Sequence, residues 1–199
     1  MKKKHYTHGF TLIEVIVVIA IISTLFAMII PSMVGFVRKS RRTADLSAAR
    51  TVSKEMLSII YNDDDVFKDM FFNSSSIGHN SGPSYSIKGK DGAQYNIIPF
   101  AMIGGKDSSS VNKSKWVCTD PDIQGFCDQI NSSMHLGYNL CIEMKYDPKP
   151  PAGQSIEADT WAICYVPSMD ELEIWVGQSS GSTSFTPMYC VYPYVSEGY

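Results

Sequence analysis

The longest apolar stretch of the chain lies close to its N-terminus and holds one acidic residue. It opens at Phe10, contains Glu14, and then runs without a charge through the 23 residues from Val15 to Val37. At about 1.5 Å per residue, a helix over those residues is about 35 Å long, which is enough to cross a bilayer. The pattern therefore predicts a membrane-spanning helix near the N-terminus.

A helical repeat of apolar residues continues past this stretch, at the spacing of three and four residues that marks the buried face of an amphipathic helix. The members of this stripe are Ala49, Val52, Met56, Ile59 and Ile60. One interpretation is a single helix from Phe10 to Tyr61, and the alternative is a separate soluble helix after a break near Gly35. Both interpretations bury the stripe in a core.

From residue 73 onward, short alternating apolar stretches separated by turn residues are typical of β-strands. Strands are expected at residues 85–87, 95–97 with an extension over 99–103, 138–146, 160–166, 171–176 and 188–192. Turns at 89–92 and 167–170 join four of them into two hairpins, whereas residues 177–187 are expected to form a loop. A long helix followed by an antiparallel sheet is an α+β architecture.

The segment before the apolar stretch is basic and ends in a glycine. Lys2, Lys3 and Lys4 precede Gly9, and the apolar stretch follows at once. An ordinary secretory signal carries its small-residue cleavage site after the apolar stretch, whereas here the small residue lies before it. This order fits a peptidase that works at the cytoplasmic face and leaves the apolar helix on the mature protein.

The six residues from Gly9 to Glu14, Gly-Phe-Thr-Leu-Ile-Glu, resemble the class III signal of type IV pilins and type II secretion pseudopilins. The resemblance implies that a prepilin peptidase cuts between Gly9 and Phe10 and then N-methylates the new Phe10 amino group. It also implies a pilin-like fold in which the helix packs on an antiparallel β-sheet head. The expected parts are a leader peptide at 1–9, a transmembrane and assembly helix half at 10–37, an amphipathic helix half at 38–62 and a globular β-rich head at 63–199.

Glu14 and Pro31 are the candidate assembly residues within the apolar helix. A carboxylate in hydrocarbon is costly and tends to have a partner. The resemblance implies that Glu14 pairs with the Phe10 amino group of a neighbouring subunit and sets the register of assembly, while the alternative is a polar residue that reaches the membrane interface. Pro31 matches a position where pilins often carry proline; because it lacks an N–H it should kink or loosen the helix, unless it is an ordinary membrane-helix proline.

Charge is divided unevenly along the chain. Residues 1–42 hold seven of the 17 Lys and Arg but one of the 20 Asp and Glu, so the part from Thr43 onward has a net charge of −9. An acidic head does not attract a phosphate backbone, and no nucleic-acid partner is expected. Basic residues flank both ends of the apolar stretch, so the positive-inside rule does not choose an orientation. The resemblance implies an inner-membrane protein with its N-terminus inside, which then enters an extracellular or periplasmic filament.

All the cysteines lie in the expected head. They are Cys118, Cys127, Cys141, Cys164 and Cys190. An odd number outside the cell leaves at least one thiol unpaired or intermolecular, and no connectivity follows from the sequence. We predict a Cys118–Cys127 disulfide within a loop and a Cys164–Cys190 disulfide, which is similar to the disulfide-bounded C-terminal loop of many type IV pilins. Cys141 is then left over.

Neither a catalytic motif nor a cofactor motif is present, so we predict that the chain is not an enzyme and binds no cofactor. Cys118, Cys127, His135 and Cys141 are suitable donors for zinc, but they lack a C-x-x-C pair and a common zinc spacing, and no metal site is predicted. The acidic run 63–65 could hold calcium, although a solvated helix cap is the better interpretation. The tryptophans, Trp116, Trp161 and Trp175, could line a ligand surface, but packing is their commoner role.

The combined pattern predicts a structural subunit of a type IV pilus-like filament. The resemblance implies four partners: the prepilin peptidase, other subunits contacted through the N-terminal helix, an assembly platform protein, and membrane lipid before assembly. The mature chain of 190 residues is larger than the compact major pilins of this leader class, which favours a minor pilin. The alternatives are a minor pseudopilin of a type II secretion system and a monomeric, membrane-anchored surface binding domain.

Overall fold

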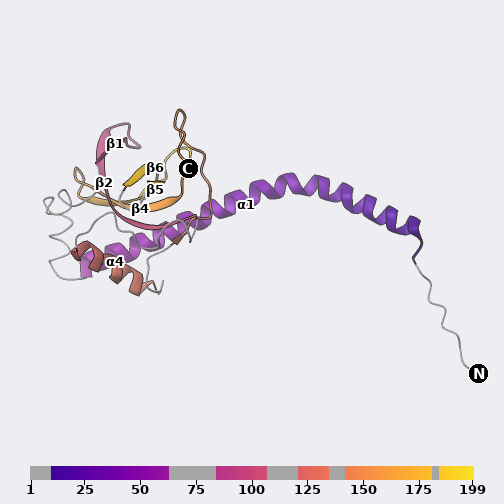
Figure 1. Cartoon of the computed structure of the whole chain (residues 1–199), viewed down its shortest axis with the longest axis horizontal. Coiled ribbons are helices and arrows are strands. Elements are labelled where there is room, and N and C mark those ends of the chain that lie inside the picture. Colours follow the sequence, from indigo (N-terminus) through magenta and orange to yellow (C-terminus); the bar gives the residue numbers. More distant parts are fainter. Residues whose placement is uncertain (1–9, 63–83, 107–120, 135–141, 181–183) are drawn as a thin grey trace, which may run out of the picture. The chain divides into compact units, whose positions relative to one another are not determined.

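The computed structural model describes residues 10–62, 84–106, 121–134, 142–180 and 184–199 (Figure 1). Helix α1 spans Leu12–Asn62, 51 residues, without an interruption at Gly35, so the prediction of one continuous helix is confirmed. Contacts divide the chain into two compact units, Met1–Arg41 and Arg42–Tyr199. The second half of α1 and the sheet therefore belong to the same compact unit, here called the head.

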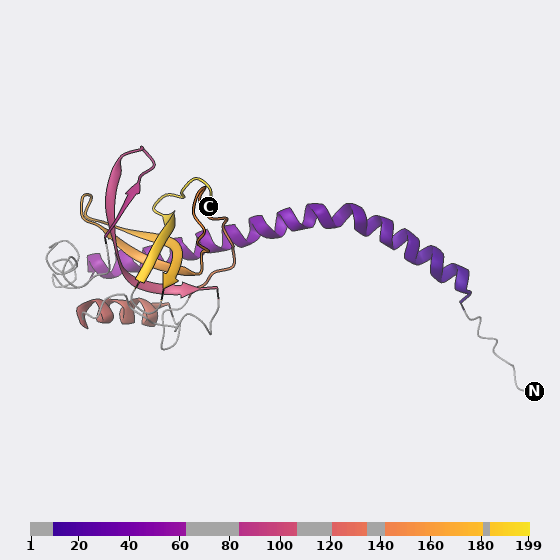
Figure 2. The ribbon, with the colours of Figure 1, turned by 45° about the horizontal axis from the view of Figure 1, so that its top comes forward.

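Within the described residues, the head contains a six-stranded sheet of order β1-β2-β4-β5-β6, with β3 paired to β2 (Figure 2). All the pairs are antiparallel except β2–β3, which is parallel. The strands are β1 (Tyr85–Lys88), β2 (Gln94–Gly105), β3 (Ile142–Glu143), β4 (Thr160–Val166), β5 (Glu171–Ser180) and β6 (Ser184–Tyr192). A second helix, α4, spans Pro121–Ser133. The α+β, pilin-like fold predicted from the sequence is confirmed.

The apolar stripe of α1 lies in the main core of the head, as its helical spacing predicts. Ala49, Val52, Met56 and Ile60 are each at most 1% exposed, and they share one hydrophobic cluster with alternate residues of β4. The intervening β4 residues, such as Ala162 and Val166, belong to a second cluster on the other face of the sheet. Both faces of β4 are therefore buried, which explains why all seven of its residues are inaccessible to solvent.

The structure confirms the two predicted hairpins and the last predicted strand, and it corrects one predicted loop and one predicted strand. The hairpins β1–β2 and β4–β5 and a last strand ending at Tyr192 form as expected. The predicted loop over 177–187 is wrong, because β5 continues to Ser180 and β6 begins at Ser184. Within the described part of the predicted strand over 138–146, β3 pairs with β2 and the N–H of Met144 still bonds to Gly105. The N–H groups of Lys145 and Tyr146 bond to Asp45 of α1 instead, so the strand ends there.

Candidate functional site

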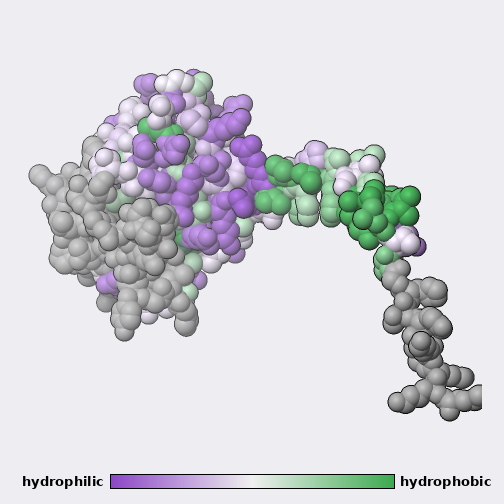
Figure 3. All heavy atoms as spheres, turned by 45° about the vertical axis from the view of Figure 1, so that its right-hand side comes forward, coloured by the Kyte–Doolittle hydropathy of each residue, from purple (hydrophilic) through white to green (hydrophobic). Residues whose placement is uncertain are grey.

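The first half of α1 presents apolar side chains on all of its sides. Every residue from Phe10 to Lys39 is exposed, and Figure 3 shows hydrophobic side chains along this part of the helix. Among the described residues, α1 is the helix whose length and composition would allow it to cross a membrane. Apolar surface on this scale is unfavourable in water, so this half of α1 requires either lipid or other helices around it.

The first turn of α1 is closed by a reciprocal pair of hydrogen bonds between Thr11 and Glu14. Oε2 of Glu14 accepts from the backbone N–H and from the hydroxyl of Thr11, both at 2.8 Å, and the backbone N–H of Glu14 donates to Oγ1 of Thr11 at 3.4 Å. This is a capping box, which satisfies donors that a helix N-terminus otherwise leaves without partners. Its signature, T-x-x-E before an apolar run, is present in the sequence and is sufficient to predict this cap.

The side chain of Phe10 precedes this cap and is 86% exposed. Both bonds to the Glu14 carboxylate end on Oε2, and a carboxylate offers about four acceptor positions. The cap therefore leaves acceptor capacity on Glu14 for an additional donor. Gly9, the other residue of the predicted cleavage site, lies outside the described residues.

Polar side chains within the apolar half of α1 bond to the helix backbone. Ser23 donates to the carbonyl oxygen of Ile19 at 2.6 Å, Thr24 to that of Ile21 at 2.8 Å, and Ser32 to that of Ile29 at 2.8 Å. Such bonds let hydroxyls enter hydrocarbon without unsatisfied groups. Pro31 lies inside α1, and the helix continues through it without a break (Figure 1).

The predicted Cys164–Cys190 disulfide is wrong, because both residues are buried free thiols. Cys164 lies on β4 and Cys190 on β6, with β5 between them. Two successive strand spacings place the Cα atoms of Cys164 and Cys190 about 9.6 Å apart, which is farther than a disulfide can bridge. Cys118, Cys141 and the side chain of Cys127 lie outside the described residues.

Two of the predicted alternatives for metal binding also fall outside the described residues, namely His135 with its neighbouring cysteines and the acidic run 63–65. In the part of the chain that the structure describes, no group of three or more His, Cys, Asp and Glu side chains could hold a metal ion. Trp161 lies fully buried in the main core, as packing predicts, whereas Trp116 is outside the described residues.

A buried carboxylate, Glu173 of β5, organises a polar cluster on the face of the sheet opposite α1. Glu173 is 2% exposed and accepts from Nε1 of Trp175 at 2.7 Å and from the hydroxyl of Tyr95 at 3.0 Å. The Tyr95 hydroxyl also bonds to that of Tyr194. Burial raises the pKa of Glu173 above its ordinary value, although the bonds from Trp175 and Tyr95 act in the opposite direction. Burial likewise raises the pKa of Tyr194 to about 12.

The raised pKa of Glu173 should make the stability of the head depend on pH. A group whose pKa is raised by folding contributes stability below its unfolded pKa, and that contribution is lost as the pH rises through the folded pKa. We expect Glu173→Gln to lose less stability than the wild type between the ordinary Glu pKa of 4.5 and neutral pH. Urea unfolding of the full chain in detergent, followed by tryptophan fluorescence, measures this; identical pH profiles for both proteins would contradict it.

A second buried carboxylate, Asp45, joins α1 to two distant segments of the head. Asp45 is 1% exposed, and it accepts from the backbone N–H groups of Lys145 at 3.1 Å and Tyr146 at 2.8 Å and from the hydroxyl of Tyr199 at 3.4 Å. The guanidinium of Arg42 lies 6.0 Å from the centre of the Tyr199 ring. Burial raises the pKa of Asp45, partly offset by these hydrogen bonds. Asp45 therefore holds the amphipathic half of α1 in place on the head.

Removing the Asp45 carboxylate should weaken this attachment. Asp45→Ala leaves the backbone donors of Lys145 and Tyr146 without their acceptor, and we expect a loss of about 2 kcal/mol in the free energy of unfolding. Urea unfolding of the full chain in detergent measures the loss. The control is Asp128→Ala, since Asp128 is an exposed residue of α4 and its truncation should change stability by less than about 0.5 kcal/mol. Equal unfolding midpoints for the two variants would contradict the assignment.

Comparison with known proteins identifies the N-terminal segment. A model described as the prokaryotic N-terminal methylation motif matches residues 4–30. This match confirms the resemblance to a class III signal, which is typical of type IV pilins and pseudopilins. No curated protein and no solved structure matches the chain.

The motif and the α+β fold together define a type IV pilin-like protein. The motif implies processing by a prepilin peptidase. Together with the apolar helix that begins within it, the motif is consistent with a prepilin anchored in the inner membrane. Pilin-like proteins are usually structural subunits without enzymatic activity.

Proposed function

We propose that the chain is a minor pilin, a structural subunit of a type IV pilus-like filament. The observation that carries this proposal is the exposed apolar half of α1, most of which lies within the matched methylation motif and which has Glu14 in its first turn. In the proposal, prepilin peptidase cuts between Gly9 and Phe10 and methylates Phe10. The N-terminus lies inside and the head outside until an assembly platform protein moves the subunit into the filament.

The proposed assembly step replaces lipid around α1 by the α1 helices of other subunits. The apolar side chains remain out of water throughout, so packing and the pairing of charged groups decide the register. Glu14 accepts the charged Phe10 amino group of a neighbour, while its Oε2 atom stays bonded to Thr11. Two isolated charges are thereby removed from hydrocarbon at once.

The first test is the mass of the N-terminus, measured on the full chain expressed with and without a prepilin peptidase. The proposal expects a terminus at Phe10 carrying one methyl group only when the peptidase is present. A terminus still at Met1 in its presence would contradict processing, and with it the filament role.

A second measurement addresses the kind of filament. A minor pilin should be recovered in fibres sheared from the cell surface, because it is part of an extracellular pilus. Recovery in the periplasmic and membrane fractions alone, from cells whose sheared fibres are otherwise complete, would instead favour a minor pseudopilin.

A further inference from the structure

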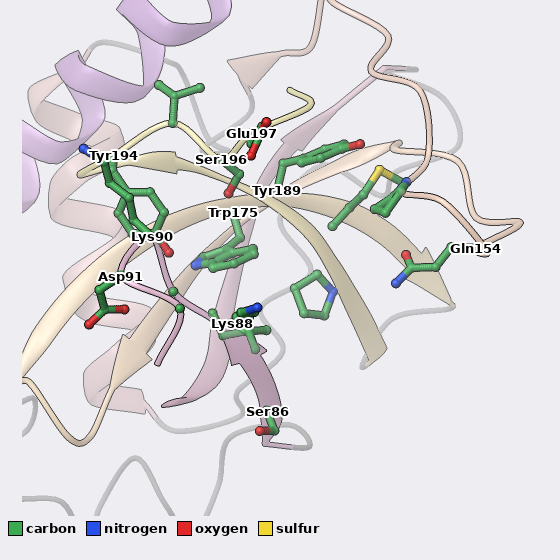
Figure 4. Close-up of a pocket in the computed structure, with 17 residues that line it drawn as sticks. Ser86, Lys88, Lys90, Asp91, Gln154, Trp175, Tyr189, Tyr194, Ser196 and Glu197 are labelled. Carbon is green, nitrogen blue, oxygen red and sulfur yellow. The ribbon is translucent and has the colours of Figure 1, made fainter. Parts of the chain in front are cut away.

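An open groove of about 900 Å³ lies on the head, outside the apolar helix surface used for assembly. Residues 86–92 of the β1–β2 hairpin form one wall and residues 194–197 form another, and Pro151, Gln154 and residues 187–189 complete it. Figure 4 shows Trp175 at the centre, between Gln154 at one end and Lys90 and Asp91 at the other. The volume lies in the range of about 300–1,000 Å³ that small-molecule sites occupy.

The groove combines rings in its interior with polar groups at its rim. The indole of Trp175, the ring of Pro187 and the phenol of Tyr194 line it, and Trp175 is 4% exposed. The rim carries hydroxyl, amide, carboxylate and ammonium groups on exposed side chains from three separate segments. They include Ser86, Lys88, Gln154 and Glu197. Such a lining offers both hydrogen-bond donors and acceptors beside a small apolar surface.

Charge and backbone bonding restrict the class of ligand. Lys88 and Lys90 are balanced by Asp91 and Glu197, so the groove attracts neither anions nor cations as a class. On the edge of β6 away from β5, Pro187 has no N–H to donate to an added peptide strand.

Further along β6, the backbone groups on this edge already bond to the C-terminal segment of the chain. The backbone N–H of Cys190 donates to Oγ of Ser196 at 2.8 Å, and the carbonyl of Cys190 accepts from the backbone N–H of Ser196 at 2.9 Å. Strand addition needs a run of unused backbone groups. A neutral ligand rich in hydroxyl groups is therefore favoured over an extended peptide or an ion.

We propose that this groove binds a neutral saccharide. The apolar faces of its sugar rings lie against the exposed parts of Tyr194 and Pro187, beside the buried indole of Trp175, and its hydroxyls bond to Gln154 and Glu197 at separate parts of the rim. The inference does not depend on filament assembly, since every residue in it belongs to the head.

The two long walls of the groove are joined by buried hydrogen bonds. The hydroxyl of Tyr95, on the hairpin, bonds to that of Tyr194, on the C-terminal segment, and also to Glu173 at 3.0 Å. Tyr95 is 7% exposed, so this link is shielded from water. Because the link fixes one wall against the other before any ligand arrives, less conformational freedom is lost on binding.

The test is a titration of the full chain with maltotriose, triacetylchitotriose and lactose, followed by calorimetry and tryptophan fluorescence. The detergent should be a polyoxyethylene ether, because maltoside and glucoside headgroups are themselves saccharides. We expect saturable binding of at least one probe with a Kd of about 1 mM or tighter. The double variant Gln154→Ala/Glu197→Ala should weaken it at least about tenfold, because each side chain supplies a hydrogen bond.

The matched control is Glu157→Ala, an exposed carboxylate outside the groove lining, which should bind like the wild type. Unfolding midpoints measured on the same samples show whether each variant is folded. Three results would overturn the proposal: no saturation by any of the three saccharides up to about 10 mM, ten times the expected Kd; unchanged affinity in the folded double variant; or an equal response to glycerol.

Discussion

Replacing Gly104 by alanine should destabilise the head by about 3 kcal/mol or more. Gly104 lies on β2, paired with Ile142 of β3 on one side and Trp161 of β4 on the other. A Cβ built there would lie 2.0 Å from the carbonyl oxygen and 2.6 Å from the nitrogen of Ile142. Both are backbone atoms, so a side-chain rotation cannot relieve the overlap. The φ of +156° at Gly104 adds backbone strain for any other residue.

The expected consequence is loss of the β2–β3 pairing, with β3 and the segment after it displaced from the sheet. Urea unfolding of the full chain in detergent gives the change in stability. The matched control is Gly125→Ala in α4, where nothing lies within 4 Å of the new Cβ. Because alanine favours helix over glycine by about 1 kcal/mol, this control should be as stable as the wild type or more so. If Gly104→Ala were equally stable, the close approach of β3 to Gly104 would be wrong.

The parts of the fold that depend on periodicity could be predicted from the sequence. The stripe from Ala49 to Ile60 has helical spacing because its residues contact one core. Residue types alternate along the hairpin strands because the two faces of each strand meet different surroundings. The strand residues that the sequence did not predict lack this alternation of residue types. Residues 177–180 and 184–187 are mostly small and polar, and they are held in the sheet by pairs such as Gln178 with Thr186 and by the bond from the Ser179 N–H to Asp159 at 2.7 Å.

The polar clusters could not be predicted in the same way, because their partners are far apart in sequence. Asp45 is separated from Lys145 by 100 residues, and Glu173 from Tyr95 by 78. Although basic residues lie just before Asp45 in the sequence, its carboxylate faces backbone N–H groups inside the head. The Thr11–Glu14 cap is different, because its two partners are three residues apart and the T-x-x-E pattern is visible in the sequence.

Glu14 should be required for assembly through its charge and not only through its cap. Glutamine suits the third helical position of a capping box nearly as well as glutamate, because its carbonyl oxygen can accept from Thr11. Glu14→Gln therefore retains the cap and removes the negative charge, whereas Thr11→Ala removes the cap hydroxyl and retains the charge. Loss of one partner of a charge pair in hydrocarbon leaves the other unpaired, at a cost of about 3–5 kcal/mol. Loss of the cap costs about 1 kcal/mol.

We therefore expect Glu14→Gln to reduce incorporation of the chain into filaments at least about tenfold, and Thr11→Ala to reduce it only a few-fold. The measurement is the amount of the chain in sheared fibres relative to its amount in whole cells. Equal urea midpoints for the head would show that neither change acts through folding, which is expected because Thr11 and Glu14 belong to the other compact unit. Normal incorporation of Glu14→Gln together with a defect in Thr11→Ala would reverse the assignment. In that case Glu14 would serve to cap α1, and the register of assembly would have to come from the packing of the apolar side chains.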